Sequence, residues 1–277
     1  MKKIYKNIIH PIESIRSNRE LLVQLIKRNL SSKYKGTTLG VVWNFLQPLV
    51  LLLVYTYAFG MLFQSRWLET SAGNLADMKF SYSIVVFCGM TVYNIFSEVV
   101  TMSPNLFVSN PNYIKKIVFP LEILPMAQVI TSLISNLIWF LILFIGAVIF
   151  AGSLSWTMLL LPVVLFPYVL MLTGISFMLA SLGVFFRDLA QVCMLITQIM
   201  YLMTPIFYSA EMVPDSLKFI LVINPLAWFV SETRKIFVFK QLPDFLGIII
   251  WLIIAVVVFY LGFCCLKKTK RGFADVL

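Results

Sequence analysis

Long stretches without a charged residue alternate with short polar segments along this chain. The stretches cover residues 36–65, 80–97, 123–186, 189–210 and 245–266. A charge at the centre of a bilayer costs about 2.5–3.5 kcal/mol, so these stretches mark membrane spans. The stretch 123–186 is about three bilayer cores long as a helix, and it must therefore hold two helices and a turn. The small and polar residues at 151–155 supply that turn.

The pattern predicts six transmembrane helices in one membrane domain that covers residues 1–277. Their predicted ranges are 38–63, 81–107, 122–150, 156–184, 189–208 and 243–265. Strands of a membrane β-barrel would alternate apolar and polar residues over about ten positions, and the apolar run at 49–54 does not. The predicted fold class is an all-α polytopic membrane protein.

Composition excludes the other classes of protein. Of the 277 residues, 60% are hydrophobic and 12% are charged, against about 25% charged residues in a typical soluble domain. Four cysteines are too few for a secreted disulfide scaffold, and the hydrophobicity excludes a disordered chain.

The net charge of +10 fits membrane orientation and does not require a nucleic-acid partner. If the six spans are correct, 16 of the 22 Lys and Arg residues lie on one side of the membrane and six on the other. The positive-inside rule then places both termini in the cytoplasm.

Residues 12–35 before the first span form a predicted amphipathic helix. Ser17 or Asn18 can cap it, and one face then carries four apolar side chains: Leu21, Leu22, Leu25 and Ile26. Its basic residues suit a helix that lies among anionic lipid headgroups. The alternative is an ordinary basic flank of the first span.

The cytoplasmic loop at 109–120 contains a second short amphipathic pattern. Ser109 or Asn110 can cap a helix, Pro111 suits its first turn, and Pro120 ends it. Such a helix either docks in a groove of a partner protein or is a capped turn held on the bilayer by its own apolar residues.

The external segment 209–244 is too apolar for a free loop and too short to cross the membrane. We expect two short helices, joined at Asn224 and Pro225, that dip into the outer interface. They either gate an exit or anchor the chain through aromatic side chains.

The chain lacks the residues that common catalytic and metal sites need. It has no Gly-Lys dipeptide and therefore no Walker A motif, and its single histidine is His10. We therefore expect no cofactor, no metal and no catalytic residue in this chain. Glu98 is the one weak candidate inside a span, and the alternative is a carboxylate that accepts a hydrogen bond from a neighbouring helix.

Aromatic residues are frequent in the spans and include Phe87, Tyr93 and Phe96 in the second. Aromatic faces stack on the apolar faces of sugar rings, so a glycan pore could use them. The alternative is ordinary contact with lipid or the membrane interface.

Segments spread over almost the whole chain resemble one family, the type-2 permeases of polysaccharide-exporting ABC transporters. They are YKGTTLGVVW at 34–43 with Pro48 after it, CGMTVYN at 88–94, NPNYIKKIVFP at 110–120, ILP at 123–125, LGVFFRDL at 182–189, TPIFY at 204–208, NPL at 224–226 and RGFADVL at 271–277. Each is weak alone, and together, in the family's order, they are specific.

The resemblance implies a homodimer in the bacterial inner (plasma) membrane, with a pair of cytoplasmic P-loop ATPase subunits that bind ATP and magnesium. The substrate would be a lipid-linked polysaccharide of the O-antigen type. The family's external gate helices correspond to residues 209–240.

The resemblance also assigns roles to individual residues. The helix that couples to the ATPase corresponds to Asn110, Pro111, Tyr113, Ile114, Lys115, Lys116, Ile117, Val118 and Phe119. The aromatic lining of the glycan channel corresponds to Trp43, Tyr55, Tyr57, Phe59, Tyr201, Phe207 and Tyr208. The lipid pyrophosphate would meet Lys33 and Lys35 at the cytoplasmic entrance.

The resulting hypothesis is the permease subunit of an ATP-driven polysaccharide exporter. Its first rival is a permease for teichoic acid or another type-2 substrate. The second is an integral-membrane enzyme of lipid-linked sugars, for which Glu98 would be the catalytic acid.

Overall fold

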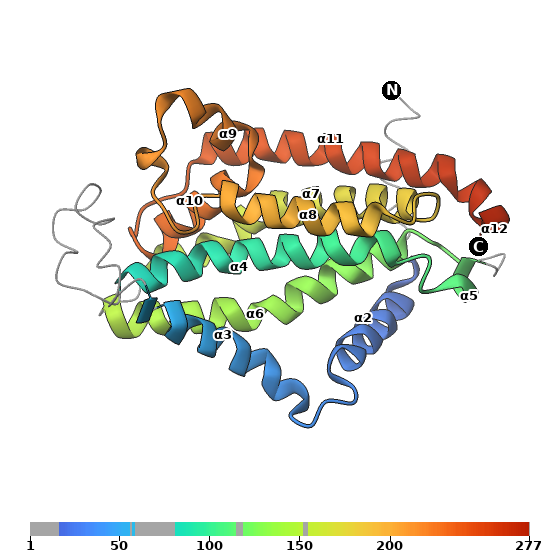
Figure 1. Cartoon of the computed structure of the whole chain (residues 1–277), viewed down its shortest axis with the longest axis horizontal. Helices are drawn as coiled ribbons and strands as arrows, with labels where there is room; N and C mark the ends of the chain where they lie inside the picture. The colour runs from blue at the N-terminus through green and yellow to red at the C-terminus, as the bar shows by residue number, and fades with distance from the viewer. Residues whose placement is uncertain (1–16, 56, 59–80, 115–118, 152–154, 277) are drawn as a thin grey trace.

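A computed structural model describes residues 17–55, 57–58, 81–114, 119–151 and 155–276 (Figure 1). Every regular element within these ranges is helical, so the predicted all-α class is confirmed. The α-helices are α2 (Arg19–Tyr34), α3 (Trp43–Tyr55), α4 (Ser81–Met102), α5 (Pro111–Ile114), α6 (Ile123–Ala151), α7 (Leu161–Gly183), α8 (Leu189–Met203), α9 (Lys218–Ile223), α10 (Pro225–Phe237), α11 (Phe245–Thr269) and α12 (Phe273–Val276).

Four segments of the described chain are long and apolar enough to cross a membrane. They are Ser83–Asn105, Ile123–Val148, Trp156–Gly183 and Phe245–Gly272. The apolar helices α3 and α8 are shorter. The chain therefore has the helices of a polytopic membrane protein, while the exact count of six spans remains a prediction.

Prolines account for two of the differences between the predicted and observed helix ends. The fifth predicted span continues to residue 208, but α8 ends at Met203, because Thr204 precedes Pro205 and takes an extended conformation. Likewise α4 ends at Met102, and Pro104 follows in a 3-10 turn, Ser103–Asn105.

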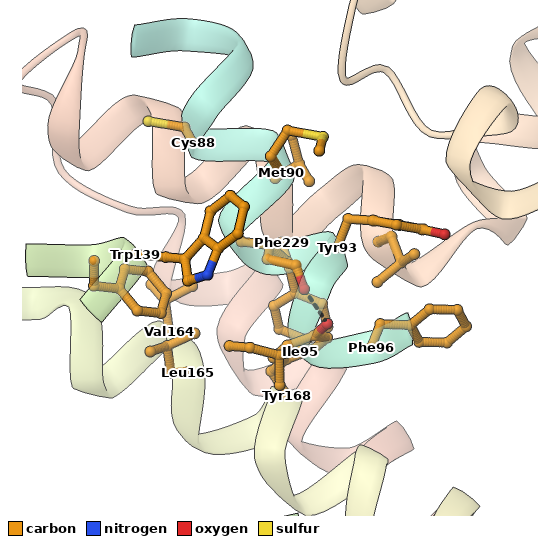
Figure 2. Packing of buried hydrophobic residues seen from close by; sticks show 14 of the residues in the cluster. Cys88, Met90, Tyr93, Ile95, Phe96, Trp139, Val164, Leu165, Tyr168 and Phe229 are labelled. Atoms are coloured by element: carbon orange, nitrogen blue, oxygen red, sulfur yellow. Dashed lines mark hydrogen bonds between the residues drawn. The ribbon is translucent and has the colours of Figure 1, made fainter. Parts of the chain in front are cut away.

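The long helices α4, α6, α7 and α11 and the shorter α8 run side by side (Figure 1). The central helix is α4, because 78% of the apolar stretch in its candidate span is buried inside the protein. The corresponding share for α11 is 28%, so α11 lies at the periphery. Figure 2 shows Trp139 of α6, Tyr168 of α7 and Phe229 of α10 packed around α4. The Tyr168 hydroxyl donates to the Val92 carbonyl at 2.8 Å, so α7 is tied to α4 inside the apolar core.

Different short helices lie at the two ends of the bundle. α2, α5 and α12 lie at one end, and α9 and α10 lie at the other (Figure 1). At the first end, Leu22 and Leu25 of α2 are buried in an apolar cluster with Phe107. The apolar face predicted for residues 12–35 is therefore covered by the bundle itself, within the part of α2 that the structure describes.

Helices α7 and α11 approach each other closely at Gly174 and Gly262, where a larger residue would clash with the facing backbone. A Cβ atom on Gly174 would lie 2.6 Å from the Phe259 Cα, and one on Gly262 would overlap the Gly174 carbonyl oxygen. The glycines therefore set how closely these two helices cross.

Candidate functional site

Lys33, predicted to meet the lipid pyrophosphate, lies at the C-terminal end of α2 and pairs with Glu98 of α4. The Lys33 Nζ is 3.0 Å from the Glu98 Oε1, and Asn136 of α6 donates to the Glu98 Oε2 at 3.1 Å. The side chains of Lys33 and Glu98 are only 28% and 15% exposed. The Glu98 carboxylate thus connects three helices. This agrees with the alternative that it accepts a hydrogen bond from a neighbouring helix.

The loop between α2 and α3 keeps the second predicted cation outside the bundle. Lys35 is exposed and ends α2, where its N–H donates to the Ser32 carbonyl. Gly36 and Gly40 follow with φ angles of +86° and +52°, a conformation that residues with a Cβ atom rarely adopt. The chain can therefore turn sharply into α3 while Lys33 points inward and Lys35 stays in solvent.

Three of the predicted channel residues meet in one aromatic cluster. The hydroxyls of Tyr55 and Tyr201 share a hydrogen bond of 3.1 Å. The ring centroid of Phe207 lies 5.9 Å from that of Tyr55 and 5.2 Å from that of Tyr201. Tyr93 of α4 joins the cluster, with its ring 4.8 Å from Tyr201 and its hydroxyl donating to the Thr197 carbonyl.

The other predicted channel residues lie elsewhere. Trp43 and Tyr57 are 43% and 58% exposed. Tyr208 donates to the carbonyls of Leu202 and Met203, so its hydroxyl caps the C-terminal end of α8. Phe59 lies outside the described residues.

The exposed faces of α3 and α8 are apolar. On α3 they include Val50, Leu53 and Val54, and on α8 they include Leu195, Ile199 and Leu202. The aromatic cluster lies between these two helices. An apolar surface of this kind contacts either lipid or another protein chain.

The predicted coupling segment begins as a helix. Pro111–Ile114 form α5, while Lys115, Lys116, Ile117 and Val118 lie outside the described residues. Asn110 donates to the Leu106 carbonyl at 2.9 Å, and the rings of Tyr113 and Phe119 lie 4.5 Å apart. These contacts hold Asn110 against the preceding turn and place Phe119 next to α5.

Arg28 of α2 fastens the N-terminal helix to this segment. It donates to the Tyr113 hydroxyl at 2.8 Å and to the Asn110 Oδ1 at 3.3 Å. Its guanidinium carbon also lies 5.5 Å from the centroid of the Tyr113 ring, within the range of a cation–π interaction. Arg28 is one of the basic residues of the predicted amphipathic helix, and nothing in the local sequence links it to Tyr113, which is 85 positions away.

At the opposite end, α9 and α10 are the two short helices expected in the segment 209–244. Asn224 lies at the junction between them. Its side chain accepts from the Leu226 N–H at the start of α10 and donates to the Thr204 hydroxyl after α8, both at 2.9 Å. α10 is buried against α4 and α7, whereas α9 exposes Phe219, Val222 and Ile223. Of the two predicted gate helices, α10 therefore belongs to the bundle core.

Arg234 holds α10 in place from inside the bundle. Its guanidinium donates to the carbonyls of Val85, Pro205 and Ile206 at 3.1, 2.6 and 2.7 Å. The carbonyls of Pro205 and Ile206 lie in the irregular segment after α8, so this side chain ties three parts of the chain together. Arg234 is one of the six Lys and Arg residues that the predicted topology places outside the cytoplasm, and the hydropathy pattern gives no sign of this buried role.

The structure also bears on metal and acid chemistry. No group of three or more His, Cys, Asp and Glu residues gathers at metal-binding distance among the residues it describes. Both oxygens of Glu98 already have partners. This carboxylate is thus engaged as a structural acceptor, which disfavours the hypothesis that makes it a catalytic acid.

Comparison with known proteins gives consistent matches. Residues 20–238 match the family model described as "ABC-2 type transporter". Two proteins named "O-antigen export system permease protein RfbA" from Klebsiella pneumoniae are 26% and 27% identical over 261 and 260 residues, and each match covers 93% of this chain and 95% of the relative. A protein of the same name from Myxococcus xanthus is 23% identical over 270 residues, which cover 97% of this chain and 99% of the relative.

Proposed function

Since the chain belongs to the ABC-2 type transporter family, we propose that it is the permease subunit of an exporter for lipid-linked, O-antigen-like polysaccharide. The observation that carries the proposal is the similarity, over 93–97% of this chain, to proteins named as O-antigen export permeases. The chain is a membrane transport subunit and not an enzyme. The glycan would move from the cytoplasm to the outer side of a bacterial inner membrane.

Energy would come from a separate pair of P-loop ATPase subunits that bind ATP and magnesium. The coupling surface consists of the segment from Asn110 to Phe119. Arg28 supports this role, because its contacts with Asn110 and Tyr113 transmit any displacement of α5 to α2. α2 in turn reaches α4 through Lys33 and Glu98, so motion at the ATPase would reach the central helix of the bundle near its C-terminal end.

The glycan channel would form between two copies of the chain. The exposed apolar faces of α3 and α8 are the surfaces that a second copy would cover. Tyr55, Tyr201 and Phe207 lie between these helices and offer rings and hydroxyls to sugar faces. Because stacking on each sugar is weak, such a surface guides a long glycan without trapping it.

Lys33 and Lys35 would receive the pyrophosphate of the lipid carrier at the cytoplasmic side. Lys35 is exposed and meets the anion first, while Lys33 is held by Glu98. A phosphate that approaches Lys33 competes with this carboxylate. In the proposed topology α3 and α8 complete six spans, both termini are cytoplasmic, and α9 and α10 form the external gate.

A pair of substitutions on α5 tests the coupling proposal. Ile114→Asp places a charge on the apolar side of the segment, whereas Asn112→Asp places the same residue at an exposed position of the same helix. We expect Ile114→Asp to reduce ATPase co-purification and glycan export at least tenfold, with Asn112→Asp close to wild type. Undiminished co-purification with a normally inserted Ile114→Asp chain would contradict the assignment.

A further inference from the structure

A cavity of about 1140 Å³ lies between α7, α9, α10 and α11, on the side of the bundle away from α3. Figure 1 shows α9 and α10 beside the N-terminal half of α11. The volume slightly exceeds the range of about 300–1,000 Å³ that is usual for small-molecule pockets. None of the residues assigned above to the channel, the entrance or the coupling segment lines this cavity.

The lining is divided into an apolar wall and a polar end. The apolar wall follows α7 from Met171 to Met178 and α11 from Ile250 to Val258. At 1.5 Å per residue, each helix contributes about 10–12 Å of continuous apolar surface. The charged residues come instead from the segment after α8 and from the C-terminal half of α10: Glu211, Arg234 and Lys235.

The cavity is continuous with the outer apolar surface of α11. Ile250 and Ile254 line it, and they are nevertheless 48% and 38% exposed. Their neighbours Ile249 and Ile253 are exposed as well, and the helix is one of the candidate membrane spans. A molecule that enters this cavity therefore comes from the hydrocarbon layer and meets apolar surface along its path.

The two basic residues at the polar end, Arg234 and Lys235, differ in how far their hydrogen-bond donors are already used within the chain. Arg234 donates to three backbone carbonyls. Lys235 pairs with the Glu232 Oε1 at 2.6 Å, while the other oxygen of Glu232 accepts from the Asp244 N–H. The Lys235 side chain is partly exposed, and an ammonium group carries three protons, so it can donate to a further anion.

We propose that this cavity is a phospholipid site in which one acyl chain lies along α7 and α11 and the phosphate meets Lys235. An acyl chain matches a long apolar wall that opens toward lipid. The charges of the polar end complement a zwitterionic headgroup, with Lys235 for the phosphate and the exposed Glu211 for an ammonium such as that of phosphatidylethanolamine. Leu221, Val222 and Ile223 of α9 would contact the bound chain.

This inference goes beyond the proposed function, because it concerns a lipid that is bound and not transported. The bound lipid would act as a wedge that sets the position of α9, the more exposed of the two external helices. The site exists whether or not the chain exports a glycan, so the two proposals can fail independently.

Photocrosslinking of the full chain in nanodiscs tests the site directly. The probe is phosphatidylethanolamine with a diazirine on one acyl chain, diluted into phosphatidylcholine, and labelled residues are mapped by mass spectrometry. Ile254→Trp fills the cavity, and Ile253→Trp is the matched control, since Ile253 is exposed on the same helix and does not line the cavity. We expect at least a fivefold loss of labelling on the facing α7 residues in Ile254→Trp and less than a twofold change in Ile253→Trp.

A second pair of variants tests the headgroup contact. Lys235→Gln should reduce labelling about threefold, whereas Lys218→Gln, whose side chain pairs with Asp215 outside the cavity, should leave it unchanged. If Ile254→Trp does not fold, Ile175→Phe fills the same cavity from α7. Equal labelling of wild type and both filling variants would overturn the proposal, as would a disulfide between two Ile254→Cys chains, which would show that a second copy covers this face.

Discussion

At the scale of single residues, Arg234 carries its charge into the interior of the bundle. The planar guanidinium donates to three carbonyl oxygens at once, and the more compact lysine ammonium cannot reproduce this geometry. Two of the three carbonyls, those of Pro205 and Ile206, lie outside any helix. Without Arg234 they would be buried with no donor.

We therefore predict that Arg234→Gln destabilises the folded chain strongly. The loss should be at least about 3 kcal/mol, because three buried carbonyl groups lose their charged donor and each unsatisfied group costs about 1–3 kcal/mol. Thermal unfolding of the detergent-solubilised chain measures the effect. Arg187→Gln, at an exposed position, is the control and should leave the midpoint unchanged. Equal midpoints for both variants would show that α10 does not depend on this side chain.

The pair formed by Lys33 and Glu98 gives a second prediction at this scale. Either Lys33→Glu or Glu98→Lys places like charges together and should lower the free energy of unfolding by about 1–3 kcal/mol. The double exchange restores an ion pair and should recover at least half of that loss. A double-mutant cycle on thermal midpoints measures the coupling. Additive losses in the double variant would mean that the two side chains do not interact.

Sequence reasoning could reach only part of this residue-scale picture. Glu98 is conspicuous because carboxylates are rare within membrane spans. Its partner Lys33 is 65 positions away, and only the packing of α2 against the bundle brings them together. Arg234 and Arg28 went unrecognised for the same reason, since their acceptors lie on segments far away in the sequence.

At the scale of elements, the number and type of helices follow from charge-free stretches, and the ends of helices follow from local chemistry. Asn224 and Asp244 cap α10 and α11 by accepting from the backbone N–H two residues ahead. Pro205 explains why α8 stops at Met203, before the end of the apolar stretch. A hydropathy pattern alone does not register such breaks, because Thr204 and Pro205 do not interrupt a charge-free run.

The contact between α7 and α11 gives a prediction for an element pair. Gly262→Ala would place a methyl group against the backbone of Gly174 and push the helices apart. We expect a loss of about 1–3 kcal/mol in the free energy of unfolding from this overpacking. Gly146→Ala in α6 is the control, because nothing lies within 4 Å of its added Cβ atom. It should be neutral or slightly stabilising, since alanine favours a helix over glycine by about 1 kcal/mol.

If Gly262→Ala instead unfolds at the wild-type temperature, the helices can separate without cost. The apolar wall of the cavity would then not be rigid either, because α7 and α11 form it together. Thermal unfolding of the two glycine variants under identical detergent conditions distinguishes these cases.

At the scale of the whole molecule, the two ends of the bundle have different chemistry. One end carries α2 and α5, joined through Arg28. The other carries α9 and α10, the latter held by Arg234. Between them, the aromatic cluster of Tyr55, Tyr201 and Phe207 lies beside apolar faces that one copy leaves exposed. This arrangement fits a subunit that receives force at one end and works together with other chains.

The sequence predicted the all-helical, membrane-spanning character of the chain better than it predicted individual contacts. The membrane itself selects for apolar spans and for Lys and Arg in cytoplasmic loops, so these two sequence patterns do not depend on how the helices pack. The assignment of channel residues was harder. An aromatic side chain in a span can face a neighbouring helix, a lipid or a pore, and the residue type is the same in all three cases. Trp43 and Tyr57 are exposed while Tyr55 is partly covered, and no local pattern separates them.

The central claim is that this chain is the transport subunit of a complex powered by a separate ATPase. The most direct measurement is affinity purification of the tagged chain from native membranes, followed by identification and quantification of the proteins that accompany it. The account predicts a P-loop ATPase in one-to-one ratio with this chain. Purification of a folded chain, with a normal thermal transition and no ATPase above background, would contradict it.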